Sequence, residues 1–460
     1  MPAPVDSSAT PQAAGTPSRR ARGPAPALSL AYPDACGIDI GSTSHFVAVP
    51  ADRDDAPVRE FRAFTADLHS LIDWLRQCRV TAVAMESTGV YWVPLYEMLD
   101  AAGFEVQLVN ARHVKTVPGR KSDVLDCQWL QQLHSFGLLC KAHRPDAAVC
   151  ALREMSRLRD ITIEERARHT QRMQKALTQM NVQLTHVITD ITGETGLKII
   201  RAIVAGERSR TVLAAMKNYR IHASVETIAK ALEGRWSREH LFSLTHELKA
   251  YDFAGEQIAS LDVEIDVLLG SMKAFDKAPE VHANKGRRKN TPAFDGRRAL
   301  LNVCGVDLTE VPGIDVGTAL KIVSEVGSNL SRFETAKRFC SWLGLCPGTR
   351  ISGNKRLSGA SKRIPNRVSR ALKLAALGLS RSRCAMGAYY RRLCLRMGSP
   401  KAITAVAHKL ARIVYAMLTG RADYVKEDQS VHDKRYRERA IKSLQRRAQA
   451  LGMTLTINPV

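Results

Sequence analysis

The spacing of apolar residues divides the first part of the chain into short strands and helices. From 36 to 49, two short apolar runs flank the turn Gly41–Ser44, which predicts a pair of strands. Beyond them the spacing predicts, in order, a helix, a buried strand, a helix, a strand and a closing helix at Ala66–Cys78, Val80–Met85, Val93–Ala102, Glu105–Val109 and Ser122–Phe136. Strands that alternate with helices in this order predict an α/β domain with a central sheet.

Between about 145 and 270 the apolar residues take helical spacing over long stretches. Leu152, Met155, Leu158 and Ile161 share one side of a helix. A second run, Leu248–Leu269, could pair with the first as an antiparallel hairpin, or it could form a dimer seam. Because the heptads are imperfect, a plain helical bundle remains an alternative.

The patterns suggest a division into consecutive parts. These are a disordered tail at 1–34, the α/β domain at 35–145, a long helical, coiled-coil-like connector at 146–272, a basic loop at 273–299, a mainly helical domain at 300–425 and a basic C-terminal helix at 426–460.

In the mainly helical domain, Leu308–Ala319 places Pro-Gly before a helix, as in a helix-hairpin-helix turn that offers backbone N–H groups to a phosphate. Such turns are also common without nucleic acid, so this assignment stays open.

The distribution of charge along the chain indicates the kind of partner that the protein binds. The 460 residues carry a net charge of +23, and from Thr335 to Ala422 there are 19 Lys and Arg but no Asp or Glu. A long acid-free segment indicates a polyanion, and nucleic acid is the first candidate. An acidic membrane fits less well, because these cations lie in a patterned globular segment.

The remaining composition argues for a cytoplasmic protein with reduced thiols. No run approaches the ~18 apolar residues of a membrane span, and the N-terminus lacks a signal pattern. The ten cysteines show neither Cys-x-x-Cys pairs nor zinc-ligand spacing.

Four acids of the α/β domain are candidates for metal chemistry. Asp39 and Glu86 each end a predicted strand, and parallel neighbours would place them side by side. Asp123 and Asp126 are three apart on a helix and share a face. Four converging carboxylates repel unless a cation neutralises them, and Mg²⁺ or Mn²⁺, in two sites, suits oxygen ligands and phosphodiester chemistry. Taken singly, Asp39 could begin a turn, Glu86 could cap a helix and Asp123 could sit at a helix N-terminus.

A serine in the second half has a setting suited to phosphate. Leu343–Arg356 is glycine-rich and basic, and Ser352 lies within it. Cations there can hold a phosphate, and glycines permit close approach. No His base is adjacent, so from the residues alone Ser352 fits a turn or cap serine better than a nucleophile.

Three stretches of the chain carry a resemblance to a known family. They are Gly37–Gly41 (GIDIG), Met85–Trp92 (MESTGVYW) and Asn110–Asp126. Together they resemble the DEDD transposases of the insertion-sequence 110 family, over nearly everything after residue 34. The resemblance implies a RuvC-like, RNase H-type fold in the first domain and a transposase domain in the second.

The resemblance also implies roles for the candidate residues. The Mg²⁺-binding acidic tetrad falls on Asp39, Glu86, Asp123 and Asp126. A serine directly before a glycine acts as nucleophile in this family, which matches Ser352, with Ser358 as the fallback if the register is shifted. The cations expected to contact nucleic acid are Arg112, Lys115, Arg120, Lys121, Arg350, Lys355, Arg356, Lys362 and Arg363.

The function implied is that of a DNA transposase that cuts and rejoins strands by Mg²⁺-dependent phosphoryl transfer through a phosphoserine. Because the serine and the tetrad lie on different domains, the resemblance implies a composite site. The family further implies a homo-oligomer, dimer or tetramer, and a structured non-coding RNA that pairs with the element ends and target DNA. Such a protein is expected in the bacterial cytoplasm, at the nucleoid when bound to DNA.

Three alternatives remain from the residues. A RuvC-like endonuclease or Holliday-junction resolvase would use the tetrad without Ser352. An actin-like or sugar-kinase ATPase could use Gly37–Thr43 as a phosphate loop, although a second loop of Asp-x-Gly-Gly type is missing. A non-catalytic nucleic-acid-binding protein would not need the acids at all.

Overall fold

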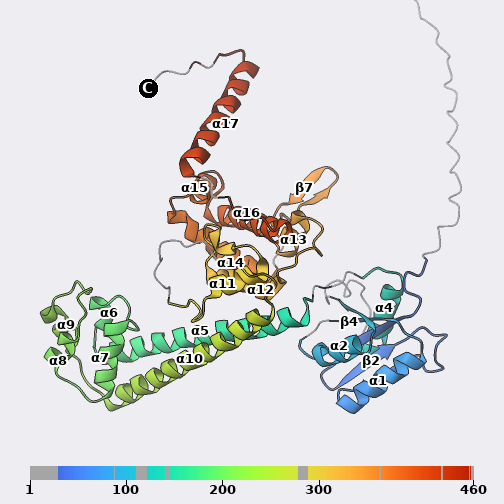
Figure 1. Cartoon of the computed structure of the whole chain (residues 1–460), viewed down its shortest axis with the longest axis horizontal. Helices are drawn as coiled ribbons and strands as arrows, with labels where there is room; N and C mark the ends of the chain where they lie inside the picture. Colours follow the sequence, from blue (N-terminus) through green and yellow to red (C-terminus); the bar gives the residue numbers. More distant parts are fainter. Residues whose placement is uncertain are drawn as a thin grey trace, which may run out of the picture. The chain divides into compact units, whose positions relative to one another are not determined.

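The computed structural model divides the chain into two compact units, 1–144 and 145–460 (Figure 1). The residues described are 29–86, 89–109, 122–139, 142, 144–277, 289–361, 364–425, 428–454 and 456, with the backbone alone at 350, 356 and 432. The predicted disordered tail therefore falls, up to residue 28, outside the described residues.

The first unit is built on a mixed five-stranded sheet in the order β3-β2-β1-β4-β5. The strands are β1 (Ala35–Ile40), β2 (Ser44–Ala48), β3 (Val58–Arg62), β4 (Ala82–Glu86) and β5 (Glu105–Val109). β1 is antiparallel to β2 and parallel to β4, and β5 is parallel to β4. The helices are α1 (Thr65–Gln77), α2 (Trp92–Ala101) and α4 (Asp123–Ser135). The predicted α/β domain is confirmed, and its sheet is consistent with an RNase H-like fold.

Opposite faces of the sheet pack on different helices. Ile38 and Met85 point into the larger core, where the apolar stripe of α1 contributes Leu71 and Leu75. On the other face, Ala84 and Val109 pack against Leu130 of α4. Because side chains alternate along a strand, Asp39 and Glu86 belong to the α4 face.

One glycine sets how closely α4 approaches the sheet. A Cβ placed on Gly37 would lie 2.3 Å from the backbone N of Gln131 and 2.4 Å from the carbonyl O of Cys127. Real Cβ atoms do not come that close to backbone atoms, so only glycine allows this packing. Gly37 thereby brings the helix that carries Asp123 and Asp126 directly over β1.

The second unit begins with two long helices, α5 (Ala147–Gln179) and α10 (Arg238–Ser271), that run side by side in opposite directions (Figure 1). Arg159 Nε donates to Asp262 Oδ1 at 2.5 Å, and both side chains are buried. Nearer the far end, His169 Nδ1 lies 2.6 Å from Glu247 Oε2. The predicted antiparallel helix pair is therefore present, with polar groups inside its seam. The structure does not test whether it is a coiled coil.

Four short helices close the far end of this hairpin around a core of their own. They are α6 (Leu184–Val187), α7 (Glu194–Val204), α8 (Arg210–Ala215) and α9 (Val225–Ala231). Ile199, Ile200 and Ile203 of α7 are fully buried there, together with Leu177 of α5 and Leu244 of α10. The sequence patterns did not predict this separate small bundle.

The near end of the hairpin packs into a mainly helical core. Its helices are α11 (Gly296–Cys304), η1 (Leu308–Glu310), α12 (Val316–Val326), α13 (Ala336–Trp342), α14 (Arg367–Gly378), η2 (Leu379–Arg381), α15 (Ala385–Met397), α16 (Ser399–Gly420) and α17 (Gln429–Ala450). A two-stranded hairpin, β6 (Arg350–Ser352) and β7 (Lys355–Ser358), extends from it. Among the described residues α16 has the length and apolarity of a membrane span, but Val406, Leu410 and Val414 lie fully buried in this core.

The Pro-Gly turn predicted as a helix-hairpin-helix lies between η1 and α12. Asp315 caps α12, and its Oδ1 accepts the backbone N–H of Thr318 at 2.9 Å. Gly313 takes φ +91°, and an added Cβ would lie 3.1 Å from the carbonyl O of Ala375. A phosphate at this helix start would meet the capping carboxylate. Phosphate contact at this turn therefore stays a prediction.

We expect Gly37→Ala to lower the thermal unfolding midpoint of the first unit, because the new methyl group must push α4 off the sheet. Overpacking of this kind costs about 1–3 kcal/mol. The matched control is Gly270→Ala in α10, where an added Cβ meets nothing within 4 Å and alanine favours the helix. Calorimetry of the full chain measures both, and an unchanged midpoint in Gly37→Ala would contradict the close packing.

Candidate active site

Two neighbouring strands and one helix supply the four acids. In the parallel ladder Ile38 of β1 pairs with Met85 of β4, so the next residues, Asp39 and Glu86, leave the sheet together at the strand ends. Asp123 and Asp126 lie in the first turn of α4, whose N-cap Ser122 accepts the backbone N–H of Leu125. The positive end of the helix dipole favours carboxylates at that position and offsets part of their repulsion.

The acids act on one another electrostatically. The pKa of Asp39 is raised from 3.8 to about 6, first by burial and then by the charges of Asp123, Asp126 and Glu86. Asp39 is half-buried, whereas Asp123 and Asp126 are exposed. The structure thus brings the other three predicted residues within electrostatic range of Asp39.

The four carboxylates suit a hard divalent cation by their chemistry, although they are not closed around one. Within the parts of the chain that the structure describes, no group of three or more His, Cys, Asp or Glu stands close enough to ligate a metal ion. All four groups are oxygen donors, as Mg²⁺ and Mn²⁺ prefer. A cation would also relieve the repulsion that raises the pKa of Asp39. The donor set therefore fits such an ion.

Ser352 lies on a β-hairpin, where the sequence pattern predicted a glycine-rich loop. It pairs with Lys355 across the two-residue loop Gly353-Asn354. Both loop residues have positive φ, +51° and +60°, which is typical of type I′ hairpin turns and favours Gly and Asn. Ser352 and Lys355 are exposed. The alternative, Ser358, instead accepts the backbone N–H of Ala360 at 3.3 Å.

Most of the residues predicted to contact nucleic acid lie outside the described part of the chain. Lys355 is the one member of that set whose side chain belongs to the described part of the chain. Outside it lie Arg112, Lys115, Arg120, Lys121, Lys362, Arg363 and the side chains of Arg350 and Arg356. These assignments stay predictions.

Gly37 is the site determinant that the sequence patterns did not reveal. It touches no reacting group, but its missing side chain lets α4 deliver two of the four acids. The available signal was a glycine two positions before Asp39 in a buried strand, where glycine often marks a close backbone approach.

Two family models match the chain. The DEDD model for IS110 elements, described as Transposase, matches residues 36–182. The model described as Transposase IS116/IS110/IS902 family matches residues 306–391. The chain belongs to the IS110 family of transposases. The first match contains all four acids, and the second contains Ser352. A search of curated proteins finds no match.

As an IS110-family transposase, the protein is an enzyme that recombines the DNA of an insertion sequence. Membership of the DEDD group implies the use of a divalent metal ion. The kinase-like reading of Gly37–Thr43 and the non-catalytic reading are therefore wrong. The identity and number of the ions, the residues that bind them and the nucleophile are matters for proposal.

We expect Asp39→Asn to stabilise the metal-free protein at pH 8 but not at pH 4. The pKa of Asp39 is about 6 in the folded chain, raised from its ordinary value of 3.8. The charge therefore costs stability progressively as the pH rises above about 4, and in full above about 6. The asparagine removes that cost.

Thermal unfolding in EDTA across this pH range measures the effect, with exposed Asp100→Asn as the matched control. Equal midpoints for Asp39→Asn and the wild type at pH 8 would show that neither burial nor the neighbouring acids make the Asp39 charge costly.

Proposed function

We propose that the protein cuts and rejoins DNA strands at a site made of the tetrad Asp39, Glu86, Asp123 and Asp126 together with the nucleophile Ser352. The observation that carries the proposal is the raised pKa of Asp39, to which burial contributes most and the charges of three acids from β4 and α4 contribute next. A protein has no structural need to gather four like charges, and a metal-dependent nuclease site does need them.

The tetrad would hold Mg²⁺ or Mn²⁺, and we propose that two ions bind. When bound, such ions supply Lewis-acid stabilisation of the charge that develops on a scissile phosphate. Asp39 and Glu86 start from strand ends that the sheet holds in register, so they define the rigid side of the site. Asp123 and Asp126 come from the exposed first turn of α4.

Ser352 would attack the phosphorus atom through Oγ. The bond to the leaving deoxyribose oxygen breaks, that oxygen takes up a proton, and the DNA stays linked to the protein as a phosphoserine ester. The ester conserves the bond energy, so a second hydroxyl can reverse the attack and rejoin the strands. Lys355, which pairs with Ser352 in the hairpin, would hold a phosphate oxygen.

We further propose that a structured non-coding RNA guides the enzyme, as the family resemblance implies. The acid-free segment from Thr335 to Ala422 is compatible with such an RNA as a polyanionic partner. The binding residues proposed for this role are the cations beside the acid motifs and the hairpin.

An oligomer is supported by a stripe of exposed apolar residues on α10. Phe242, Phe253, Val263 and Val267 are 74%, 60%, 62% and 63% exposed. Their spacing places them on one side of the helix, away from the residues that α10 buries. Large exposed apolar residues in one row are typical of an interface between protein chains. We propose that this stripe joins two copies of the chain.

A covalent adduct tests the serine mechanism. Purified protein with its co-purified RNA, Mg²⁺ and element-end DNA should form a protein–DNA band on a denaturing gel. The band should vanish in Ser352→Ala and persist in the control Ser358→Ala, because the adduct requires the Ser352 Oγ. Asp39→Asn should abolish cleavage altogether.

Cleavage without an adduct in Ser352→Ala, at the wild-type rate, would instead favour a RuvC-like endonuclease or junction resolvase that uses the tetrad alone. If the band is lost in Ser358→Ala and retained in Ser352→Ala, the nucleophile is Ser358.

The double substitution Phe253→Glu and Val263→Glu should convert the oligomer to single chains of 50.7 kDa, because buried like charges oppose association. Light scattering after size-exclusion chromatography measures the mass. Tyr219→Glu, at a residue 82% exposed outside the stripe, is the control and should leave the mass unchanged. A double variant that keeps its oligomeric mass would contradict an interface on this face.

A further inference from the structure

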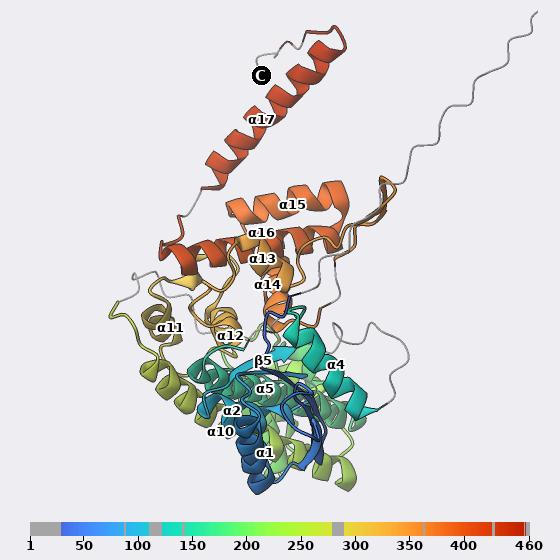
Figure 2. The same ribbon diagram turned by 90° about the vertical axis from the view of Figure 1, so that its right-hand side faces the viewer.

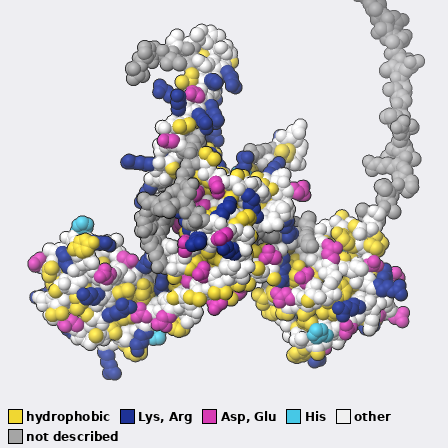
Figure 3. Space-filling view, in the orientation of Figure 1, with side chains coloured by type: hydrophobic (Ala, Val, Ile, Leu, Met, Phe, Trp, Pro, Cys, Tyr) yellow, Lys and Arg dark blue, Asp and Glu magenta, His cyan; other side chains and the backbone are white. Residues whose placement is uncertain are grey.

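Helix α17 extends from the second unit with little of its surface covered. It lies beyond the segments that the family models match, and Figures 1 and 2 both show it projecting past α15. It carries seven Lys and Arg but two acids, Asp433 and Glu438. Figure 3 shows the cationic side chains along it. Because none of the described side chains of α17 is buried, packing does not explain a helix of this charge.

One side of α17 is occupied by its contact with α15. Arg392 Nη1 donates to Asp433 Oδ1 at 2.7 Å. The same guanidinium stands 4.3 Å from the ring centre of Tyr436. These contacts fix which side of α17 faces the protein, and they engage one of its two acids.

The opposite side of α17 carries a row of cations. Arg435, Arg439, Lys442 and Arg446 recur at intervals of four, three and four residues, so they fall within about 60° of arc on a helix of 3.6 residues per turn. The middle of this row lies roughly 150° around the helix from Asp433. All four residues are exposed. We call them the cation row.

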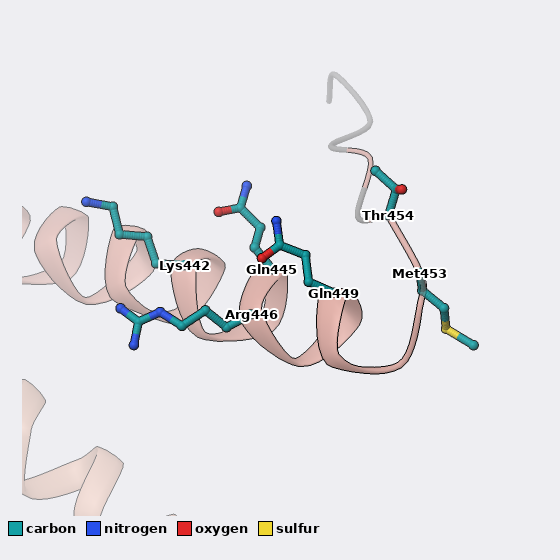
Figure 4. A pocket seen from close by; sticks show the side chains of 6 residues that line it. All are labelled: Lys442, Gln445, Arg446, Gln449, Met453 and Thr454. Carbon is teal, nitrogen blue, oxygen red and sulfur yellow. The ribbon is translucent and has the colours of Figure 1, made fainter.

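A polar hollow continues the cation row at the end of the helix. Figure 4 shows the six residues that line it, namely Lys442, Gln445, Arg446, Gln449, Met453 and Thr454. Two of them are cations of the row, two are amides and one is a hydroxyl. Each of these five side chains can donate a hydrogen bond to a phosphate oxygen.

The length and chemistry of the row suit the backbone of a DNA duplex. The row extends over about 16 Å of helix, which matches about five successive phosphates of one strand at 3.4 Å each along the axis. Single-stranded nucleic acid is usually held by aromatic stacking, but the aromatic residue of α17, Tyr436, packs on Arg392. No acid interrupts the row, because Glu438 lies beside it and Asp433 on the far side.

We propose that α17 is a sequence-independent clamp for duplex DNA, which the cation row and the adjoining hollow grip by its phosphates. This inference rests on DNA being the partner, as membership of the transposase family establishes, but it does not depend on the serine mechanism. The clamp would hold DNA that flanks the reacting site.

The test compares two triple variants of equal charge. The first, Arg439→Gln, Lys442→Gln and Arg446→Gln, removes three of the four cations of the row. The second, Lys434→Gln, Arg437→Gln and Arg447→Gln, removes cations that lie roughly 110° or more from the middle of the row. Both are made in the full-length Ser352→Ala protein, so that binding is measured without cleavage and a failed serine mechanism cannot affect the result. Circular dichroism checks that both fold.

Binding to a random-sequence 30-bp DNA duplex is measured by fluorescence anisotropy from 50 to 200 mM salt. The row variant should bind at least ~10-fold more weakly at 100 mM, and its slope of log K against log salt should fall by about 2.7, the value for three lost phosphate contacts. The control variant should change the slope by less than about 1.

Equal losses in the two variants would overturn the clamp, because charge alone would then explain binding. The wild type could instead prefer single-stranded DNA, duplex RNA or phosphatidylserine vesicles. If the row variant alone abolished that preference, the clamp would likewise be overturned and the row would be assigned to that partner.

Discussion

The contact between α4 and the backbone of β1 at Gly37 is the constraint on which the candidate active site depends. Asp39 and Glu86 are held by the parallel ladder, but the other two acids belong to a helix that could dock at many distances. The backbone atoms of Cys127 and Gln131 occupy the space of a missing side chain, and this fixes the distance. The close approach brings Asp123 and Asp126 near enough to raise the pKa of Asp39.

The cost of this arrangement falls mainly on Asp39. Asp39 is half-buried, and burial first and repulsion second raise its pKa. The exposed first turn of α4 lets water and the helix dipole moderate the charges of Asp123 and Asp126. A half-buried acid whose pKa is raised by other acids beside it is typical of functional rather than structural clusters.

The second unit depends on a different kind of constraint. Its long hairpin joins two separate cores, the small bundle α6–α9 and the C-terminal helices. The middle of the seam holds a buried ion pair, Arg159 with Asp262, and the carboxylate also accepts the backbone N–H of Ala293 at 2.9 Å. An apolar seam would tolerate a sliding register, whereas a paired buried charge does so only at high cost. The ion pair therefore helps to keep the two cores at a set separation.

The elements that were predicted correctly are those with regular apolar spacing, such as α1, α2 and β5. The edge strand β3 was missed because Arg59, Glu60 and Arg62 give it no apolar run, as is common for strands at a sheet edge. The bundle α6–α9 was missed because its helices are too short for periodicity to register. The hairpin of Ser352 was predicted as a loop, although a Gly-Asn pair such as Gly353-Asn354 between two short strands is a hairpin turn signal.

By itself, the sequence determined which residues could do chemistry, because acids at strand ends and motifs such as Gly37–Gly41 are local patterns. It also determined the net charge and the family. It took the packed chain to show that the pKa of Asp39 is raised by three other acids, that α4 approaches β1 closely and that the cation row of α17 lies away from its docked side. Those facts depend on distances between segments remote in sequence, and packing sets such distances, which no local pattern records.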